Sequence, residues 1–219
     1  MGSGIRVANI EYAYDPTHED LISAPVTQAW GWESQQWQFH GNGVLGQLVA
    51  PANGYGVTGA IPDAEVLMIS PYSDVDVYNV GEAIIQSLNW LVQGDVILIE
   101  QQTVGWEAYC PMEYIPAVFD AIQWAVAEGV SVVEPAANGS QDLDATQWDG
   151  WFDLEIQDSG AIMVGGGGGL DNPQVWSGGS SFGSRIDVQG WYQNIVTVGG
   201  YEIADLFFPQ DDVRQAYTQ

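Results

Sequence analysis

The sequence predicts an α/β protein: a three-layer sandwich with a mostly parallel β-sheet between helices. Short apolar runs of strand length alternate with segments whose apolar residues recur at helical spacing. Strands that are apolar throughout are typical of parallel sheets buried on both faces. The 219 residues are enough for a sizeable core, and we expect residues 1–219 to form one domain.

Six apolar runs bounded by turn residues are expected to be strands, namely residues 5–13, 64–70, 95–101, 129–137, 160–166 and 194–200. Two helices are expected over 80–94 and 114–129, each ending at a glycine. The five glycines at 165–169 follow the fifth strand and predict a flexible loop. They lack the lysine and Ser/Thr of a phosphate-binding loop.

The charge of the chain is strongly one-sided. There are 29 acidic residues against three arginines, with no lysine, and the formal net charge is −26. Such a surface repels phosphate backbones and anionic membranes, so we expect no nucleic-acid or membrane partner. The composition suggests a saline or calcium-containing exterior, although compositional drift or engineering would give the same pattern.

Cysteine usage and the N-terminus bear on the compartment. Cys110 is the one cysteine, so no internal disulfide can form, and its expected role is that of a small buried apolar residue. No run of 18 apolar residues is present. The start, MGSG, has no signal-peptide character. We expect an extracellular, secreted protein whose signal peptide is not present in this chain.

Two candidate residues, Glu11 and Asn138, stand at the carboxyl ends of predicted strands, where chemistry is expected in a parallel sheet. Glu11 ends the first strand, and His18 follows it by seven residues in the turn HEDL. His40 opens the small-residue segment HGNGVLG, and Asn138 follows the strand GVSVVEPAA. The glycines of GNGVLG also form a loose dinucleotide fingerprint, but no clear strand precedes them.

An acid, a histidine and an asparagine in this order resemble the subtilisin-like serine peptidase family. HGNGVLG is similar to the family's HGT.VAG box, GYGVTGAIPDAEV to its G..GVAP.A.L segment, and SSFGSRIDVQGW to its FS..G...D..APG segment. The resemblance covers nearly the whole chain and implies a subtilisin-like fold. It also implies that His40 is the base, that Glu11 orients the imidazole, and that Asn138 donates to the oxyanion.

The resemblance also implies a polypeptide substrate and the residues that border it. Glu100, Gln101 and Gln102 would lie beside the side chain that precedes the cleaved bond, and Tyr72 would line a neighbouring pocket. His18 is expected to have a turn role and no catalytic one. Glu11 departs from the family, which has an aspartate there, so the imidazole or the backbone must accommodate one more methylene.

The family's nucleophile segment, GTS.A.P, does not occur in this sequence. The serines at 177, 180, 181 and 184 belong to WSGGSSFGS, which matches the strand before that segment. Two interpretations follow. The chain is a serine endopeptidase domain, incomplete at its C-terminus, whose serine comes from a separate or missing C-terminal segment, or it is an inactive subtilisin-like scaffold or binding module.

No cofactor is required by this chemistry, and the sequence does not single out metal ligands. Family members often bind calcium, and the segment 139–153 offers oxygen ligands that suit a hard cation, namely Asp142, Asp144, Asp149 and Asp153. Their spacing does not match an EF-hand loop, and a solvated acidic loop is the alternative.

Overall fold

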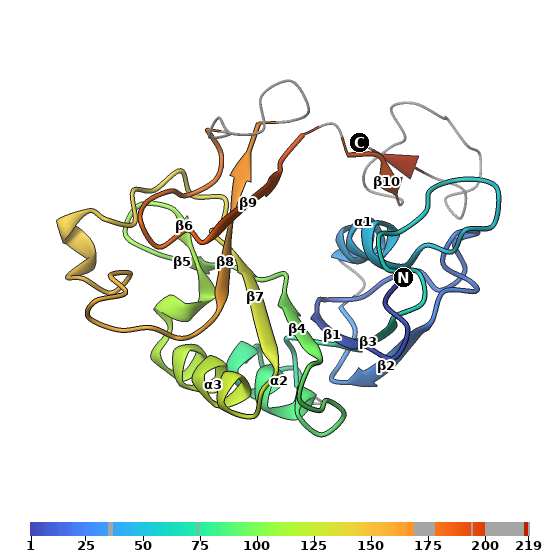
Figure 1. Ribbon diagram of the computed structural model, residues 1–219, viewed down its shortest axis with the longest axis horizontal. Coiled ribbons are helices and arrows are strands. Elements are labelled where there is room, and N and C mark those ends of the chain that lie inside the picture. Colours follow the sequence, from blue (N-terminus) through green and yellow to red (C-terminus); the bar gives the residue numbers. More distant parts are fainter. Residues whose placement is uncertain (35–36, 74, 169–177, 194, 200–216, 219) are drawn as a thin grey trace. The chain divides into compact units, whose positions relative to one another are not determined.

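The computed structural model describes residues 1–34, 37–73, 75–168, 178–193, 195–199 and 217–218. The chain divides into two compact units, and each has its own parallel strands. The first unit comprises residues 1–78 and 195–219, and the second comprises 79–194. Figure 1 shows the elements of both units along the chain.

The first unit is built on three parallel strands in the order β2-β3-β1. These are β1 (Arg6–Ile10), β2 (Val26–Trp30) and β3 (Glu65–Ile69). Helix α1 (Gln38–Val49) packs against the short strand β10 (Thr197–Val198), which pairs antiparallel with β11 (Tyr217–Thr218). The last four residues of β1 and of β3 are buried, as their mostly apolar sequences predict, and Asn9 is the polar residue among them.

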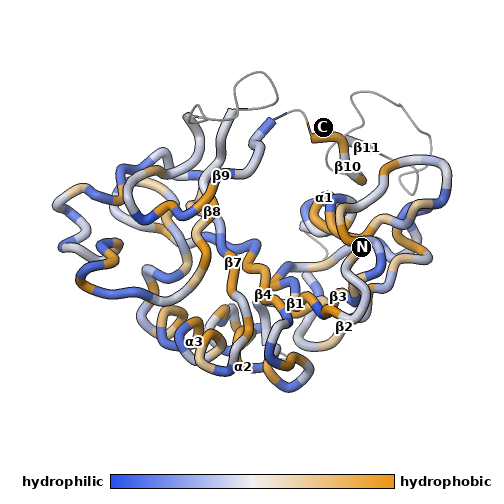
Figure 2. The backbone as a smooth tube through the Cα atoms, in the orientation of Figure 1, coloured by the Kyte–Doolittle hydropathy of each residue, from blue (hydrophilic) through white to orange (hydrophobic). Residues whose placement is uncertain are grey.

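The second unit has four parallel strands in the order β4-β7-β8-β9. They are β4 (Val96–Ile99), β7 (Ser131–Pro135), β8 (Ile162–Gly167) and β9 (Val188–Trp191). Helices α2 (Val80–Ser87) and α3 (Pro116–Ala127) pack side by side, and α3 also contacts β7 (Figure 1). Figure 2 shows hydrophobic residues along β4 and β7, whereas the colours of α2 and α3 are mixed.

Smaller elements of the second unit lie between β4 and β8 in the chain. A hairpin joins β5 (Thr103–Val104) to β6 (Tyr109–Cys110), and two 3₁₀ turns follow, η2 (Met112–Tyr114) and η3 (Thr146–Trp148). The side chains of Cys110, Leu143, Trp148 and Phe152 form a buried cluster beneath them. The fully buried thiol of Cys110 therefore belongs to a core.

The predicted α/β fold with a mostly parallel sheet is confirmed, but four details of the prediction are wrong. Strands β2 and β9 were not expected, and within the described residues 195–199 the strand is β10, which has two residues and is antiparallel. β8 extends to Gly167, so three of the five glycines expected as a loop at 165–169 lie in a strand, and Gly169 lies outside the described residues. The helix that begins at Val80 ends at Ser87 and not at Gly94.

Physical reasons account for two of these differences. A side chain at Gly165 would bring its Cβ to 3.0 Å from Ile186 Cγ2, so the bare backbone lets β8 approach that residue closely. After α2, the backbone N–H groups of Leu88 and Asn89 donate to the carbonyls of Ile85 and Gln86, three residues earlier. This spacing is that of a 3₁₀ turn, so the chain continues in tighter turns and not as an α-helix.

Candidate active site

Glu11 is a buried carboxylate immediately beyond the carboxyl end of β1. Its N–H donates to the carbonyl of Ile69 at 3.0 Å, which continues the β1–β3 pairing by one residue. Its Oε1 accepts the N–H of Tyr12 at 2.6 Å, and its Oε2 forms a short hydrogen bond and ion pair with Nδ1 of His40. The residue is only 1% exposed, so the imidazole is its main side-chain partner among the described contacts.

His40 lies in the first turn of α1, and its side chain is 45% exposed. One ring nitrogen thus binds a buried carboxylate while much of the ring stays accessible to solvent. The helix begins at Gln38, two residues before His40. A carboxylate on Nδ1 fixes the tautomer of an imidazole and stabilises its charged form, so the pair has the geometry of an oriented base.

Hydrogen bonds tie the start of α1 to the segment that follows β1. Gln38 Nε2 donates to the carbonyl of Tyr14 at 2.9 Å. Asn42 Oδ1 accepts the N–H of Asp15 at 2.7 Å, and its Nδ2 donates to the carbonyl of Gly199 at 2.9 Å. The contacts to Tyr14 and Asp15 hold the backbone on both sides of His40 against the segment that follows Glu11, and the contact to Gly199 ties α1 to the residue after β10.

The glycines of HGNGVLG have a packing role. A Cβ at Gly41 would collide with the carbonyl oxygen of Ala13 and would lie 3.1 Å from Glu11 Cγ. A Cβ at Gly46 would lie 2.7 Å from the backbone nitrogen of Val198. Gly41 therefore lets α1 approach the Glu11 loop, and it leaves room for the longer side chain that replaces the family's aspartate.

Tyr72 belongs to a group of aromatic rings in the first unit. Its ring centroid lies 6.1 Å from that of Tyr12, 6.0 Å from Trp32 and 5.4 Å from Tyr78. Tyr12 also contacts Trp37 at 6.3 Å. Burial among these rings raises the pKa of Tyr78, with Tyr12 and Tyr72 adding to the effect. Because Tyr12 follows Glu11 in sequence, this aromatic group continues from the Glu11–His40 pair.

Asn138 lies in the second unit, three residues beyond the end of β7, and is exposed. Its backbone N–H donates to Gln102 Oε1 at 2.8 Å. The preceding residue, Ala137, has a left-handed backbone with φ of 71°, which is uncommon for a residue other than glycine. A Cβ at Gly139 would collide with the carbonyl of Tyr109, so the loop packs tightly on β6.

The remaining predicted residues have these placements. Gln102 holds the backbone of Asn138, Gln101 is buried and Glu100 is partly buried, all directly after β4. His18 is buried, and its Nδ1 accepts the N–H of Asp20 at 3.1 Å, which is a turn contact. Their roles toward a substrate stay predictions, as does the description of residues 1–219 as one incomplete domain.

The serines near the end of the described chain bond within the second unit. Ser180 Oγ accepts the N–H of Gly166 at 2.9 Å, Ser181 Oγ accepts the N–H of Gln141 at 3.4 Å, and Ser184 Oγ donates to Asp144 at 2.6 Å. Ser177 lies outside the described residues.

In the acidic segment that could bind calcium, two aspartate side chains accept backbone N–H groups two residues further along the chain, as in local turns. Asp142 accepts the N–H of Asp144 at 3.0 Å, and Asp153 accepts the N–H of Glu155 at 2.9 Å. In the part of the chain that the structure describes, no group of three or more His, Cys, Asp or Glu side chains could hold a metal ion. Calcium binding remains a prediction.

Two residues that shape the site were not identified from the sequence. Asn42 bridges two distant backbone segments, and Thr197 Oγ1 donates to the carbonyl of Gly43 at 2.6 Å. The signal for Asn42 was an amide side chain between two glycines next to His40. Thr197 gave no sequence signal, because its partner is 154 residues away.

These observations define the class: a parallel α/β fold in which a buried strand-end carboxylate bonds to a histidine at a helix start. No family model matches the sequence. It is 26% identical over 154 residues to the major intracellular serine protease of Bacillus subtilis (strain 168), covering 67% of this chain and 46% of that protein. It is also 26% identical over 155 residues to the intracellular serine protease of Paenibacillus polymyxa, covering 66% and 45%.

Solved structures agree on the fold. The subtilisin-like protease Apa1 from Pseudoalteromonas sp. AS-11 matches with a TM-score of 0.67 and 18% identity over 89% of this chain and 43% of that one. The self-cleaved protease domain of PatA matches with a TM-score of 0.67 and 18% identity over 91% and 71%. The chain is similar in sequence to intracellular serine proteases and in fold to subtilisin-like proteases, and it spans under half the length of the curated relatives it matches.

The comparisons correct one prediction. We expected an extracellular protein, but both curated relatives are named as intracellular proteases, so that expectation is wrong. The acidic composition from which it was drawn reports on surface charge and salt response rather than on location. Among the described residues, no helix has the length and apolar character needed to cross a bilayer.

Proposed function

We propose that this chain supplies the acid–base half of a serine-type endopeptidase that hydrolyses peptide bonds by acyl transfer. The observation that carries the proposal is the contact between buried Glu11 and half-exposed His40. His40 would accept the proton of a nucleophilic hydroxyl and later return it to the leaving amine. Glu11 would hold the tautomer and stabilise the imidazolium.

The nucleophilic serine is proposed to come from a segment outside residues 1–219. The described serines that resemble the family's preceding strand are engaged in other hydrogen bonds, as Ser184 is with Asp144. Asn138 is proposed as the oxyanion donor. Its exposure and the bond that Gln102 makes to its backbone support that role, because the side-chain amide stays available while the backbone is held.

A polypeptide is proposed as the substrate. The aromatic rings around Tyr72 would contact apolar side chains near the cleaved bond, since Trp32, Trp37 and Tyr78 are 41–49% exposed next to the Glu11–His40 pair. Glu100 and Gln101 are proposed to lie beside the substrate residue that precedes the cleaved peptide bond.

Adding a serine-bearing segment in trans tests the proposal. We expect a fluorophosphonate probe to label the mixture of this chain with a peptide carrying the GTS segment. His40→Ala should abolish labelling, and Asn138→Ala should slow it by about 10²–10³. Gln47→Ala, on an exposed position of α1, is the matched control and should label like the unmodified chain.

Two results would refute the enzyme assignment. One is the absence of labelling while the added peptide is demonstrably bound, which would support the scaffold or binding-module interpretation. The other is unchanged labelling in His40→Ala, which would mean that the Glu11–His40 pair is not the base. Labelling of the isolated chain at Ser177, Ser180, Ser181 or Ser184 would overturn the placement of the nucleophile.

A further inference from the structure

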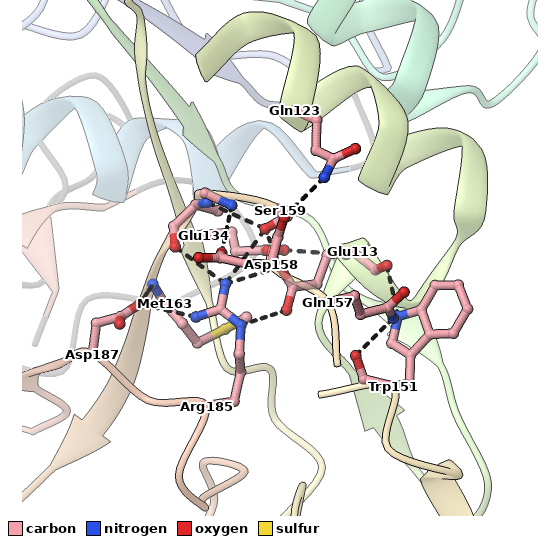
Figure 3. Close-up of polar contacts among 12 residues, drawn as sticks. Glu113, Gln123, Glu134, Trp151, Gln157, Asp158, Ser159, Met163, Arg185 and Asp187 are labelled. Atoms are coloured by element: carbon pink, nitrogen blue, oxygen red, sulfur yellow. Dashed lines mark hydrogen bonds and ion pairs between the residues drawn. The ribbon is translucent and has the colours of Figure 1, made fainter. Parts of the chain in front are cut away.

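A buried cluster of charged side chains lies in the second unit, separate from the Glu11–His40 pair. Arg185 is only 2% exposed, and its guanidinium grips Glu113 with two bonds, from Nε at 2.7 Å and from Nη2 at 2.9 Å (Figure 3). Nη1 donates to Asp187 at 2.9 Å, and Nη2 also reaches the carbonyl of Ala161 at 3.1 Å. This arrangement is a bidentate, charge-assisted ion pair.

Glu134 is the member of this cluster that the arginine does not satisfy. It lies on β7 with no exposed surface, and its Oε2 accepts the backbone N–H of Glu113 at 3.3 Å. Among the described residues, its Oε1 has no hydrogen-bond partner. The hydrogen bonds that Arg185 makes there go to Glu113, Asp187, Ser159 and Ala161.

The charges around Glu134 show why its ionisation would destabilise the folded protein. One guanidinium faces Glu113 from η2 and Asp187 from the segment before β9, so these two carboxylates already offset it. A third carboxylate would be a buried charge without a bonded cation, and the native fold avoids such charges by keeping the group neutral.

The other titratable groups packed around Glu134 do not offset its charge. Burial raises the pKa of Glu134 well above its usual range, the charge of Glu113 raises it further, and Arg185 opposes the shift only in part. The Cys110 thiol approaches from β6, and its pKa is raised to about 12, first by burial and then by Glu134. The thiol is therefore neutral near pH 7. The hydroxyl of Ser159 donates to Glu113 at 2.5 Å, so this hydrogen bond goes to Glu113 and not to Glu134.

We infer that the folded second unit carries one bound proton on the Glu113–Glu134 pair at neutral pH, so that Glu134 is an uncharged acid in the core. Ionisation would place two negative carboxyl groups side by side between β7 and η2. Because β7 leads directly to Asn138, loss of the proton would first disturb the strand that positions that loop. This inference does not depend on peptidase activity.

The test is the pH dependence of unfolding in urea for the full chain and for Glu134→Gln, which keeps the shape but cannot ionise. The folded state holds a proton that the unfolded state releases above about pH 4.3. Stability therefore falls as pH rises from there to the raised pKa. Over that window the unfolding constant of the unmodified chain, relative to that of Glu134→Gln, should increase about tenfold per pH unit.

Glu155→Gln is the matched control, because Glu155 is exposed in the same unit. Its pH profile should run parallel to that of the unmodified chain. A second measurement needs no variant: infrared spectra of chain labelled with ¹³C at glutamate carboxyl groups should show a protonated carboxyl at pH 7. Parallel profiles for Glu134→Gln and the unmodified chain, or no protonated carboxyl in the folded protein at pH 7, would overturn the inference.

Discussion

Replacing Gly41 by alanine should destabilise the protein, although the same change usually stabilises a helix. Alanine is favoured over glycine inside a helix by about 1 kcal/mol. At Gly41, however, the new Cβ would collide with the carbonyl oxygen of Ala13 and press on the side chain of Glu11. A backbone carbonyl cannot rotate away as a flexible side chain can, so the start of α1 must move.

The size of the effect follows from what the movement disturbs. Overpacking of this kind costs typically 1–3 kcal/mol. Each hydrogen bond lost from Asn42, to Asp15 or Gly199, adds about 0.5–1.5 kcal/mol. With one of these bonds lost, and after subtraction of the helix-propensity gain, the net loss is about 0.5–3.5 kcal/mol. At about 2–4 °C per kcal/mol for a chain of this size, that corresponds to a fall in Tm of roughly 1–14 °C.

Gly43→Ala is the control, because it makes the same chemical change two residues further along α1. Its Cβ would lie 3.6 Å from Thr197 Cγ2 and 3.8 Å from the carbonyl of Val198, which are ordinary contacts. It should raise Tm by roughly 2–4 °C. The assay is thermal unfolding followed by circular dichroism. A Tm that rises equally in both variants would refute the packing argument at Gly41.

Three further outcomes are expected. Because the net charge is −26, Tm should rise from low salt to molar sodium chloride, and calcium should raise it further; a flat or falling Tm in salt would contradict the role of self-repulsion. The Cys110 thiol, fully buried with a pKa of about 12, should resist a disulfide-exchange reagent at pH 8 until the protein unfolds, and rapid labelling of the native chain would contradict that burial. Thr197→Val should lower the free energy of unfolding by about 1 kcal/mol through loss of the bond to Gly43, and an unchanged value would show that this bond contributes nothing.

The strands that the sequence predicted correctly are rich in apolar residues, and each has at least two buried positions. β1 and β3 have four successive buried residues, whereas β4, β7 and β8 alternate buried with exposed or partly exposed ones. β2 and β9 read differently. Each ends its group of paired strands, has no buried residue, and contains glutamine among its few positions. A composition of that kind cannot be separated from a loop without knowledge of the partner strand.

The candidate site divides in a similar way. Glu11 and His40 were identified because their surrounding motifs resemble a family whose chemistry needs them. The packing that holds them could not be predicted, because it joins residues that are far apart in sequence. Asn42 binds segments 27 and 157 residues away, and Gly41 is required by the carbonyl of Ala13. Such contacts depend on where the backbone lies after folding, which no local pattern records.

An acidic, lysine-free chain can still fold because its buried carboxylates do not depend on lysine. Asp20 accepts the backbone N–H of Val57 and the amide of Asn53, each at 2.7 Å. Asp95 accepts the N–H of Val92 at 2.9 Å, and Glu113 takes the guanidinium of Arg185. Backbone and side-chain amide groups and the guanidinium of Arg185 thus donate the hydrogen bonds that water would otherwise donate to these carboxylates. Among the described carboxylates, Glu134 keeps one buried oxygen, Oε1, that these donors do not reach, and we infer that a proton removes its charge instead.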